Sequence, residues 1–345
     1  MKFLLYTSYA YGFPIIRPLQ EEILRRGFDA AWFIEIEENK NKLNPSEKLL
    51  NTVEEVINYK PDIVLVASNE VPHFFPGIKV QLFHGFSVNK RSKNKGHFRI
   101  RGFFDLYCTQ GPSTTALFEQ LAKKHKHFKV IETGWSKVDV LFINKKEITK
   151  KKPVVFVAST FTEQLSLAHN NTVFKEIKRL IKSKDWKWII NLHPKMNPQI
   201  VEKFKDLDSF ENVTYLPILE TLEPLKLADV LLTDTSSIIT EFIIQIKPVV
   251  TFNNAKPQDC FINIKSSNEL EENLELAIDR PKEIIDKIKL FANEEHPYRD
   301  GKSAERVINA SINFYKQNTI LSLKAKPLNI IRKFKIRKSF NYYKL

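Results

Sequence analysis

The sequence predicts an α/β protein built from two facing Rossmann-like domains. Short β-rich runs alternate with helical patterns over almost the whole chain, which is typical of parallel sheets. The 345 residues correspond to about two average domains. A polar, basic and aperiodic stretch at 145–152, followed by Pro153, divides the pattern into two halves of similar size. Such paired domains bind ligand in the cleft between them, at the carboxyl ends of their strands.

The first domain is expected at 1–145 and contains six predicted strands. These are Phe3–Thr7, Ala30–Ile34, Ile63–Ala67, Val80–Phe83, Leu106–Thr109 and Lys129–Glu132. Helical periodicity lies between several of them, at Leu19–Arg26, Pro45–Tyr59 and Ser113–Lys124.

The second domain is expected at 153–318 and repeats the alternation. The predicted strands are Val154–Ala158, Trp188–Leu192, Val213–Leu216, Val230–Thr233 and Val249–Phe252. The predicted helices are Asn171–Ser183, Pro198–Lys205, Thr221–Leu227, Ser237–Ile246, Glu269–Asp279, Pro281–Asn293 and Ser303–Lys316.

Composition excludes several classes of protein. Hydrophobic residues make up 43% and charged residues 27%, as in a chain that buries a core. The two cysteines cannot build a disulfide framework, and no spacing of ligands suggests zinc, so we expect no metal. Neither GxGxxG nor GxxxxGK[ST] occurs, and we expect no cofactor. No apolar run reaches the ~18 residues that span a bilayer, which favours a cytoplasmic protein.

Positive charge is concentrated in two stretches. Residues 321–345 hold eight basic residues and no acid, and residues 90–101 hold six and no acid, so together they account for the net charge of +14. In the tail at 319–345, basic residues interleave with Ile331, Phe334 and other apolar residues. This basic amphipathic pattern favours a peripheral position on an anionic membrane surface. A solvated helix packed on the body is the alternative, and no motif supports nucleic-acid binding.

The sharpest local signal is Asp234-Thr235-Ser236-Ser237, which follows a buried strand and opens a helix. Free backbone amides, the positive end of the helix dipole and hydroxyl groups converge there, which suits a phosphate or diphosphate. A plain helix cap by Asp234 or Ser236 is the alternative.

Two further strand ends carry histidine. His193 and Lys195 follow the strand at 188–192 and could donate hydrogen bonds to phosphate oxygens. His84, followed by Gly85, stands at the expected cleft edge of the first domain. A neutral histidine can take a proton from an attacking hydroxyl near neutral pH, and glycine permits close backbone approach or a positive φ.

The loop at 133–139 follows the last strand of the first domain. Thr133 and Gly134 indicate a cleft loop, and Lys137 adds a positive charge. Asp139 is as compatible with capping a helix-like segment at 140–143 as with binding a ligand.

Taken in order, these motifs resemble the CDP-glycerol glycerophosphotransferase family, which builds teichoic-acid-type polymers and some capsules. The resemblance covers about 78–310. It rests on His84-Gly85, Thr133-Gly134 with Asp139, Ala158-Ser159-Thr160-Phe161, His193-Pro194-Lys195, Asp229 with Asp234-Thr235-Ser236-Ser237, Lys247-Pro248-Val249, and Asp300-Gly301-Lys302-Ser303 with Arg306.

The resemblance implies a GT-B-like fold and transfer of glycerol phosphate from CDP-glycerol to a hydroxyl of a lipid-linked glycan or polymer acceptor. It implies that His84 is the base and that His193, Ser236 and Ser237 hold the diphosphate. Gly85, Thr133, Gly134, Lys137, Asp139, Thr160, Lys195, Asp234, Thr235 and Glu241 are the remaining candidate substrate-binding residues.

The chain departs from the family's pattern at Phe83, Thr235, Ser136-Lys137 and Glu241. A related CDP-polyol is therefore an alternative donor. Glu241 also favours a second interpretation, a GT-B glycosyltransferase or a UDP-sugar 2-epimerase-like enzyme. A third is a non-catalytic protein that binds an anionic polymer or membrane through its basic stretches.

Overall fold

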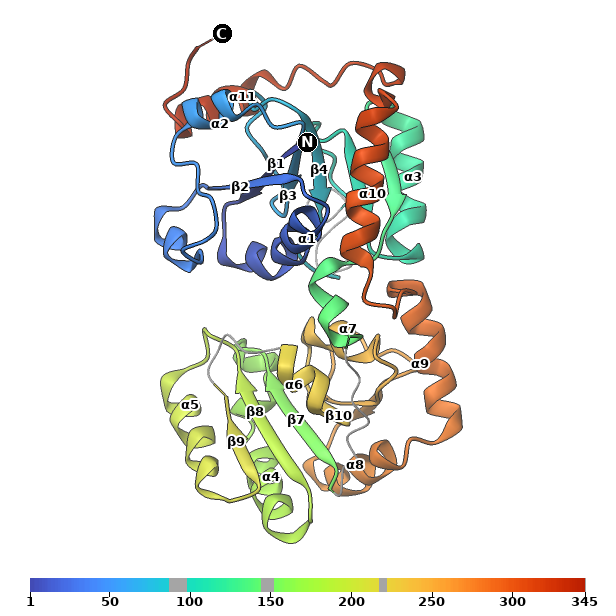
Figure 1. Cartoon of the computed structure of the whole chain (residues 1–345). Helices are drawn as coiled ribbons and strands as arrows, with labels where there is room; N and C mark the ends of the chain where they lie inside the picture. The colour runs from blue at the N-terminus through green and yellow to red at the C-terminus, as the bar shows by residue number, and fades with distance from the viewer. Residues whose placement is uncertain (87–97, 144–151, 217–221, 345) are drawn as a thin grey trace. The chain divides into compact units, whose positions relative to one another are not determined.

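The computed structural model describes residues 1–86, 98–143, 152–216 and 222–344. The chain forms two compact units (Figure 1). Unit 1 contains Met1–Asp139 and Tyr298–Leu345, and unit 2 contains Val140–Pro297. The predicted second domain, 153–318, therefore has to be corrected, because its last 21 residues belong to unit 1. Most of the basic stretch 90–101 and of the predicted linker 145–152 lies outside the described residues.

Unit 1 is built on a six-stranded parallel sheet with the order β2-β1-β3-β4-β5-β6. The strands are β1 (Lys2–Thr7), β2 (Asp29–Ile34), β3 (Ile63–Val66), β4 (Ile78–Leu82), β5 (Leu106–Thr109) and β6 (Lys129–Glu132). β1 pairs with β2 on one side and with β3 on the other. The chain thus reverses its winding between β1 and β3, which is where doubly wound sheets bind ligands.

The helices of unit 1 are α1 (Phe13–Arg25), α2 (Val53–Tyr59), α3 (Pro112–His125), α10 (Ser303–Lys316) and α11 (Ile330–Ser339). α10 runs next to α1 (Figure 1), and the Arg26 side chain donates to Asn309 Oδ1 at 2.6 Å. The hydroxyl of Tyr315 at the end of α10 donates to Asp62 at 2.7 Å. These bonds fix the returning C-terminal segment to the first unit.

Unit 2 contains a second six-stranded parallel sheet, with the order β12-β11-β10-β7-β8-β9. The strands are β7 (Val154–Ser159), β8 (Lys187–Leu192), β9 (Val213–Tyr215), β10 (Val230–Thr233), β11 (Val249–Phe252) and β12 (Ile262–Ile264). β7 is buried along its whole length, which explains its uninterrupted apolar sequence. In sequence order this is the 3-2-1-4-5-6 arrangement of a Rossmann fold, with the switch point between β7 and β10.

The helices of unit 2 are α4 (Asn171–Ser183), α5 (Pro198–Lys205), α6 (Leu222–Leu227), α7 (Ile238–Ile243), α8 (Leu270–Asp279) and α9 (Lys282–Glu295). Large buried side chains such as Trp188 and Phe204 fill the core between helices and sheet. Two six-stranded parallel sheets with helices confirm the predicted α/β class and the Rossmann-like units.

The predicted helix at Pro45–Tyr59 is wrong in its first half. Leu50 donates its backbone N–H to the carbonyl of Trp32 at 2.8 Å, so this stretch extends alongside β2. The helix begins only at Val53, where the side chain of Thr52 accepts the N–H of Glu55 at 3.1 Å and caps it.

Candidate functional site

The predicted site residues lie at the carboxyl ends of strands in both sheets. His84, Gly85 and the loop Thr133–Asp139 follow β4 and β6 in unit 1. Thr160, His193-Lys195 and Asp234–Ser237 follow β7, β8 and β10 in unit 2, with Glu241 on α7. Each unit thus assembles one half of the predicted set.

His84 is exposed at the carboxyl edge of the unit 1 sheet. Its ring contacts the ring of Tyr11, with 5.1 Å between centroids. Partial desolvation, and then the positive charge of Arg101, lower the pKa of His84 below its usual value. A larger share of its imidazole is therefore neutral at a given pH, and the neutral ring is the form that accepts a proton.

The loop Thr133–Asp139 packs directly behind His84. The indole N–H of Trp135 donates to the carbonyl of Phe83 at 2.6 Å. Gly134 has φ +80°, a conformation that favours glycine. Thr133 is fully buried, and its hydroxyl donates to the carbonyl of Gly134 at 3.0 Å, while Lys137 lies 5.1 Å from the Trp135 ring centroid. The structure therefore brings this loop together with His84.

Asp139 has a structural role. Its carboxylate accepts the backbone N–H groups of Ser303 at 3.0 Å and Ala304 at 2.8 Å, so it caps α10. The predicted cap of a helix at 140–143 has to be corrected to a cap of α10. Arg306 adds a 2.8 Å bond to the carbonyl of Thr133. Burial, the largest contribution, raises the pKa of Asp139, and the hydrogen bonds from Ala304 and Ser303 oppose this rise.

The backbone at Gly85 uses neither the positive φ nor the close approach that glycine permits. The φ of Gly85 lies outside the left-handed region, and nothing lies within 4 Å of the Cβ that a side chain would add. The space around Gly85 is open at the edge of the sheet, next to His84.

Asp234 organises the switch point of unit 2. Its fully buried carboxylate accepts the hydroxyl of Ser159 at 2.6 Å, the backbone N–H of Thr160 at 3.1 Å and that of Leu167 at 3.0 Å. Desolvation outweighs these bonds and raises the pKa of Asp234. The carboxylate thus ties the loop after β7 to the end of β10.

The residues after Asp234 are more accessible. Thr235 Oγ1 accepts the N–H of Ala255 at 2.9 Å, and Ser236 Oγ accepts that of Ile238 at 3.4 Å. Ser237 is exposed, and Glu241 on α7 is half-buried. α7 is shorter than the predicted Ser237–Ile246, because it ends before Ile246, whose φ of 59° is left-handed.

His193 and Lys195 sit next to the loop after β7. The Nδ1 of His193 accepts the backbone N–H of Lys195 at 3.0 Å, which places the proton of the neutral ring on Nε2. The His193 ring lies 4.4 Å from that of Phe161, and the Lys195 ammonium lies 5.9 Å from the same Phe161 ring. The carboxyl ends of neighbouring strands β7 and β8 therefore present a histidine, a lysine and an aromatic ring together.

Sequence reasoning missed two pockets. One, of about 420 Å³, lies at the switch point of unit 1. The other, of about 230 Å³, lies in unit 2 between residues 163–170 and the end of β11. Their polar residues are scattered over several segments and form no local motif.

The C-terminal segment is docked on unit 1. Ile336 is buried with Phe33 and Phe75 in the core, and Phe340 packs against it. The Lys326 ammonium pairs with Asp105 at 2.6 Å. The alternative prediction, a helix packed on the body, therefore holds for the face of α11 that carries Ile336.

Over the described ranges, no group of three or more His, Cys, Asp or Glu side chains could hold a metal ion. No helix in the same part of the chain has the length and apolarity needed to cross a bilayer.

The fold of the chain is GT-B-like. The wall teichoic acid polymerase TagF has a TM-score of 0.67 at 13% identity, over 92% of this chain and 90% of that chain. The UDP-GlcNAc 2-epimerase from Neisseria meningitidis, bound to UDP-GlcNAc, has a TM-score of 0.63 at 16% identity, over 91% of this chain and 100% of that chain. S. aureus MnaA with UDP has a TM-score of 0.62 at 18% identity, over 92% of this chain and 97% of that chain. These likenesses concern the fold.

A family model described as UDP-N-acetylglucosamine 2-epimerase matches residues 109–311, more than half of the chain. The chain belongs to this family. No curated protein matches the sequence. The resemblance to the glycerophosphotransferases is accordingly supported at the level of the GT-B fold, which TagF shares with the epimerases.

Proposed function

We propose that the protein transfers glycerol phosphate, or a related polyol phosphate, from a CDP-linked donor to a hydroxyl of a membrane-linked glycan or polymer and releases CMP. One observation carries this proposal. At the switch point of the unit 2 sheet, the hydroxyls of Ser236 and Ser237 follow β10, and His193 and Lys195 follow β8, while unit 1 offers an exposed histidine with a lowered pKa.

In this mechanism, unit 2 holds the donor. His193 and Lys195 donate to oxygens of the diphosphate, and Ser236 and Ser237 donate hydroxyls to it. Asp234 accepts the Thr160 amide and so holds the loop after β7 in place. The histidine, the lysine and the two hydroxyls balance the negative charge that accumulates on the leaving CMP, so binding and charge stabilisation supply most of the catalysis.

The reaction itself is a displacement at phosphorus. The acceptor oxygen attacks the phosphorus that carries the glycerol, and the bond from this phosphorus to the oxygen of CMP breaks. CMP leaves with the electron pair of that bond. His84 takes the proton of the acceptor hydroxyl as the new phosphorus–oxygen bond forms.

An assay of nucleotide release tests the proposal. The purified chain is incubated with CDP-glycerol, CDP-ribitol or UDP-GlcNAc and an acceptor, in the presence of chelator. We expect CMP to be released from a CDP-polyol and no nucleotide to be released from UDP-GlcNAc. His84→Gln should lower this rate by at least about 100-fold while CDP binding persists, and His125→Gln, elsewhere in unit 1, should leave it unchanged. Activity only after addition of a divalent metal would contradict the metal-free mechanism.

A second function is favoured by the family match and by Glu241. The chain would then act on a UDP-sugar, as a 2-epimerase-like enzyme or a glycosyltransferase. Epimerisation of UDP-GlcNAc, or release of UDP from it, with no CMP from any CDP-polyol, would replace the transferase proposal by this one.

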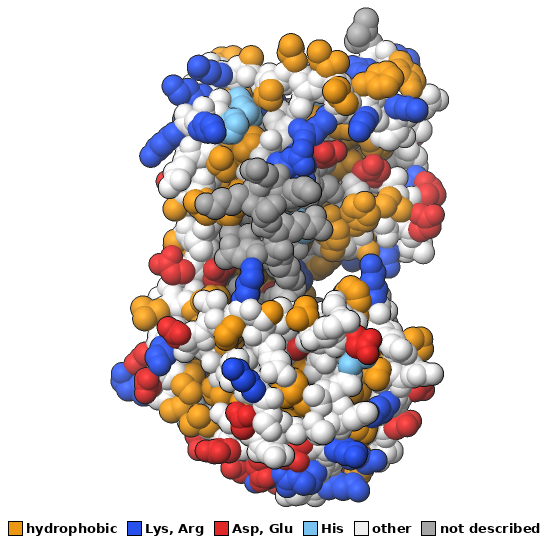
Figure 2. Space-filling model, turned by 180° about the vertical axis from the view of Figure 1, so that it is seen from behind, with side chains coloured by type: hydrophobic (Ala, Val, Ile, Leu, Met, Phe, Trp, Pro, Cys, Tyr) orange, Lys and Arg blue, Asp and Glu red, His pale blue; other side chains and the backbone are white. Residues whose placement is uncertain are grey.

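We also propose that the protein acts on the cytoplasmic face of an anionic membrane, through the C-terminal segment. While Ile336 packs inward, Ile331 is 74% and Phe334 57% exposed, and the half-buried Lys333 and the exposed Lys335 flank Phe334. Hydrophobic and basic side chains lie side by side at the top of unit 1, where Figure 1 places this segment (Figure 2). Apolar burial and attraction to anionic lipid act together on such a surface.

Vesicle flotation tests the membrane surface. Binding to phosphatidylglycerol vesicles is expected to exceed binding to phosphatidylcholine vesicles at least about tenfold, because basic residues near the surface each add about 1 kcal/mol. The double variant Lys333→Glu/Lys338→Glu should lose this preference. Lys123→Glu/Lys124→Glu on α3 changes the net charge equally and should keep it. Equal flotation of both double variants would contradict the proposed surface.

A further inference from the structure

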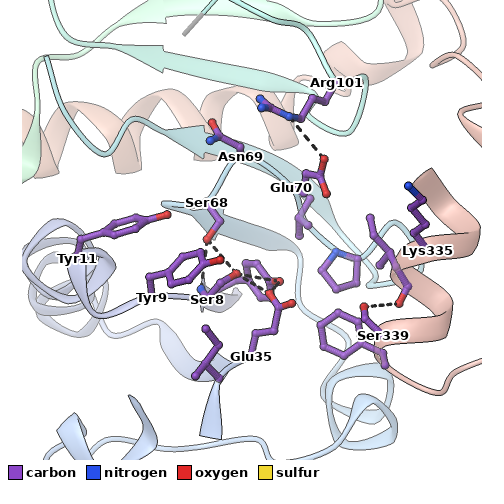
Figure 3. A pocket seen from close by; sticks show the side chains of 16 residues that line it. Ser8, Tyr9, Tyr11, Glu35, Ser68, Asn69, Glu70, Arg101, Lys335 and Ser339 are labelled. Atoms are coloured by element: carbon purple, nitrogen blue, oxygen red, sulfur yellow. Dashed lines mark hydrogen bonds and ion pairs between the residues drawn. The ribbon is translucent and has the colours of Figure 1, made fainter. Parts of the chain in front are cut away.

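The pocket of about 420 Å³ in unit 1 has the position and size of a small-molecule site. It lies at the carboxyl ends of β1, β2 and β3, beside the switch point of the sheet. Figure 3 shows Ser8, Ser68 and Glu35 clustered in it, with Lys335 and Ser339 of α11 on another side. The proposed donor chemistry uses none of these residues.

The polar groups of the pocket are already oriented. The Glu35 carboxylate accepts hydrogen bonds from the hydroxyls of Tyr6 and Ser8. The Ser68 hydroxyl donates to Ser8 Oγ at 3.2 Å. Because partners on the protein fix these groups, a ligand would meet a preorganised set of acceptors and donors.

The charges of the pocket balance. Glu35 and Glu70 face Arg101 and Lys335 as lining residues, and Arg101 pairs with Glu70 at 3.5 Å. A phosphate dianion would meet two carboxylates in this pocket, which disfavours it. A ligand that both donates and accepts hydrogen bonds without net charge fits better, since carboxylates accept from hydroxyls and cations donate to them.

Aromatic rings complete the pocket. Tyr9 and Tyr11 both line it and stack on each other, with centroids 5.4 Å apart. Tyr9 is 52% exposed, so a large ring surface is available to the C–H face of a ligand. Tyr11 also contacts His84, which connects the pocket to the proposed base.

We infer that this pocket binds an uncharged, hydroxyl-rich ligand, either a sugar ring or a polyol. Where the proposed transferase function holds, on which this part rests, the ligand is the hydroxyl-bearing end of the acceptor, and Tyr11 lies between it and His84. The C-terminal helix is then part of the binding site, because Lys335, Ile336 and Ser339 form one of its walls.

The test measures binding to the full-length protein without donor and without turnover. Saturation-transfer NMR and titration use ribitol and methyl β-glucoside as neutral probes and ribitol 5-phosphate as the charged one. We expect both neutral probes to bind in the millimolar range, and Glu35→Gln to weaken them at least tenfold. Glu38→Gln, in the 3₁₀ segment Glu37–Lys42 that follows Glu35 but outside the pocket, should leave binding unchanged.

Two further variants keep the test decisive if Glu35→Gln fails to fold. Tyr9→Ala removes an exposed ring and should weaken the neutral probes at least threefold. Lys335→Gln should weaken them similarly, whereas Lys338→Gln on the same helix should not. If Tyr9→Ala and Lys335→Gln both bind the two neutral probes as tightly as the unmodified protein does, the inference is overturned.

Two outcomes with the unmodified protein would also overturn it. One is the absence of neutral-probe binding, and the other is ribitol 5-phosphate binding more than tenfold tighter than ribitol. Since no nucleotide is present, the pocket can fail this test while CMP release succeeds. The reverse result, sugar binding without CMP release, would overturn the transferase and leave the pocket assignment in place.

Discussion

Asp234 and Ser159 form a 2.6 Å hydrogen bond that joins the carboxyl ends of β10 and β7. The two residues are 75 positions apart in the chain, and Asp234 is fully buried at the switch point of the unit 2 sheet. The same carboxylate accepts two backbone N–H groups from the loop after β7. It therefore decides the shape of that loop and the position of Thr160.

Asp234→Asn should destabilise the protein by about 1–3 kcal/mol, because an amide N–H₂ would face donors that now bind a carboxylate. The loop after β7 should loosen, and CDP should bind more weakly. Chemical unfolding and nucleotide titration measure both effects. Asp279→Asn, exposed at the end of α8, is the matched control and should change neither. Unaltered stability and CDP affinity in Asp234→Asn would show that the carboxylate does not hold the loop.

The pKa of His84 predicts the acid limb of the activity profile. Since the neutral ring is the base and its pKa is lowered from the model-compound value of 6.5, the rate of CMP release should fall with acidification only below pH 6.5. Removing the nearby positive charge in Arg101→Gln should raise this pKa and move the limb to higher pH. The measurement is kcat/KM between pH 5 and 8. Arg99→Gln, exposed two residues away, should not move the limb, and an unmoved limb in Arg101→Gln would contradict a titrating base that senses the charge of Arg101.

The docking of the C-terminal segment should depend on pH through His73. The Arg337 guanidinium donates to His73 Nε2 at 3.3 Å, and Arg337 also lies 5.3 Å from the Phe74 ring centroid. Burial, followed by the charges of Arg337, Lys333 and Lys79, lowers the pKa of His73 from 6.5 to about 4. Its Nδ1 is buried and has no hydrogen-bond partner among the described residues.

A lowered histidine pKa means that the detached state binds the proton more tightly than the docked state. The contribution of His73 to docking is therefore fully present above pH 6.5 and is lost progressively as pH falls toward 4. Hydrogen exchange of residues 330–344 should accelerate between pH 7 and 5, after correction for intrinsic rates. His73→Gln should flatten this dependence, and an equally steep dependence in that variant would assign it to other groups.

Much of the fold could be predicted because its elements carry local signals. β7 is buried on both faces and reads as an unbroken apolar run, and α4 shows a clear helical period. The stretch before α2 misled the prediction, because residues 48–50 pair with Trp32, which no local pattern reveals. β12 was missed because Asn263, a residue type that is rare in strands, interrupts its apolar pattern.

The candidate site could be predicted only where it follows a strand end. His84, His193 and Asp234 stand directly after apolar runs, and the topology puts them at a carboxyl edge. The role of Asp139 was hidden, because its partner Ser303 lies 164 residues away. The unit 1 pocket was missed for the same reason, since Glu35, Ser68 and Lys335 come from segments far apart in sequence.

Gly102 packs against Pro327 in the C-terminal segment. Its φ is +74°, and a Cβ there would lie 2.5 Å from Pro327 Cγ. Gly27 has a similar φ of +72°, but nothing lies within 4 Å of its Cβ position. The two glycines therefore separate backbone strain from steric conflict with the C-terminal segment.

Gly27→Ala should cost about 1–2 kcal/mol of unfolding free energy, the strain of a left-handed alanine, without affecting the segment. Gly102→Ala should bear the same strain and in addition displace Pro327. Faster hydrogen exchange over 324–344 and stronger proteolysis there are expected in Gly102→Ala alone. Because Lys335 lines the unit 1 pocket, that variant should also bind ribitol more weakly. Identical exchange of the segment in the two variants would show that Pro327 can yield without undocking the helix behind it.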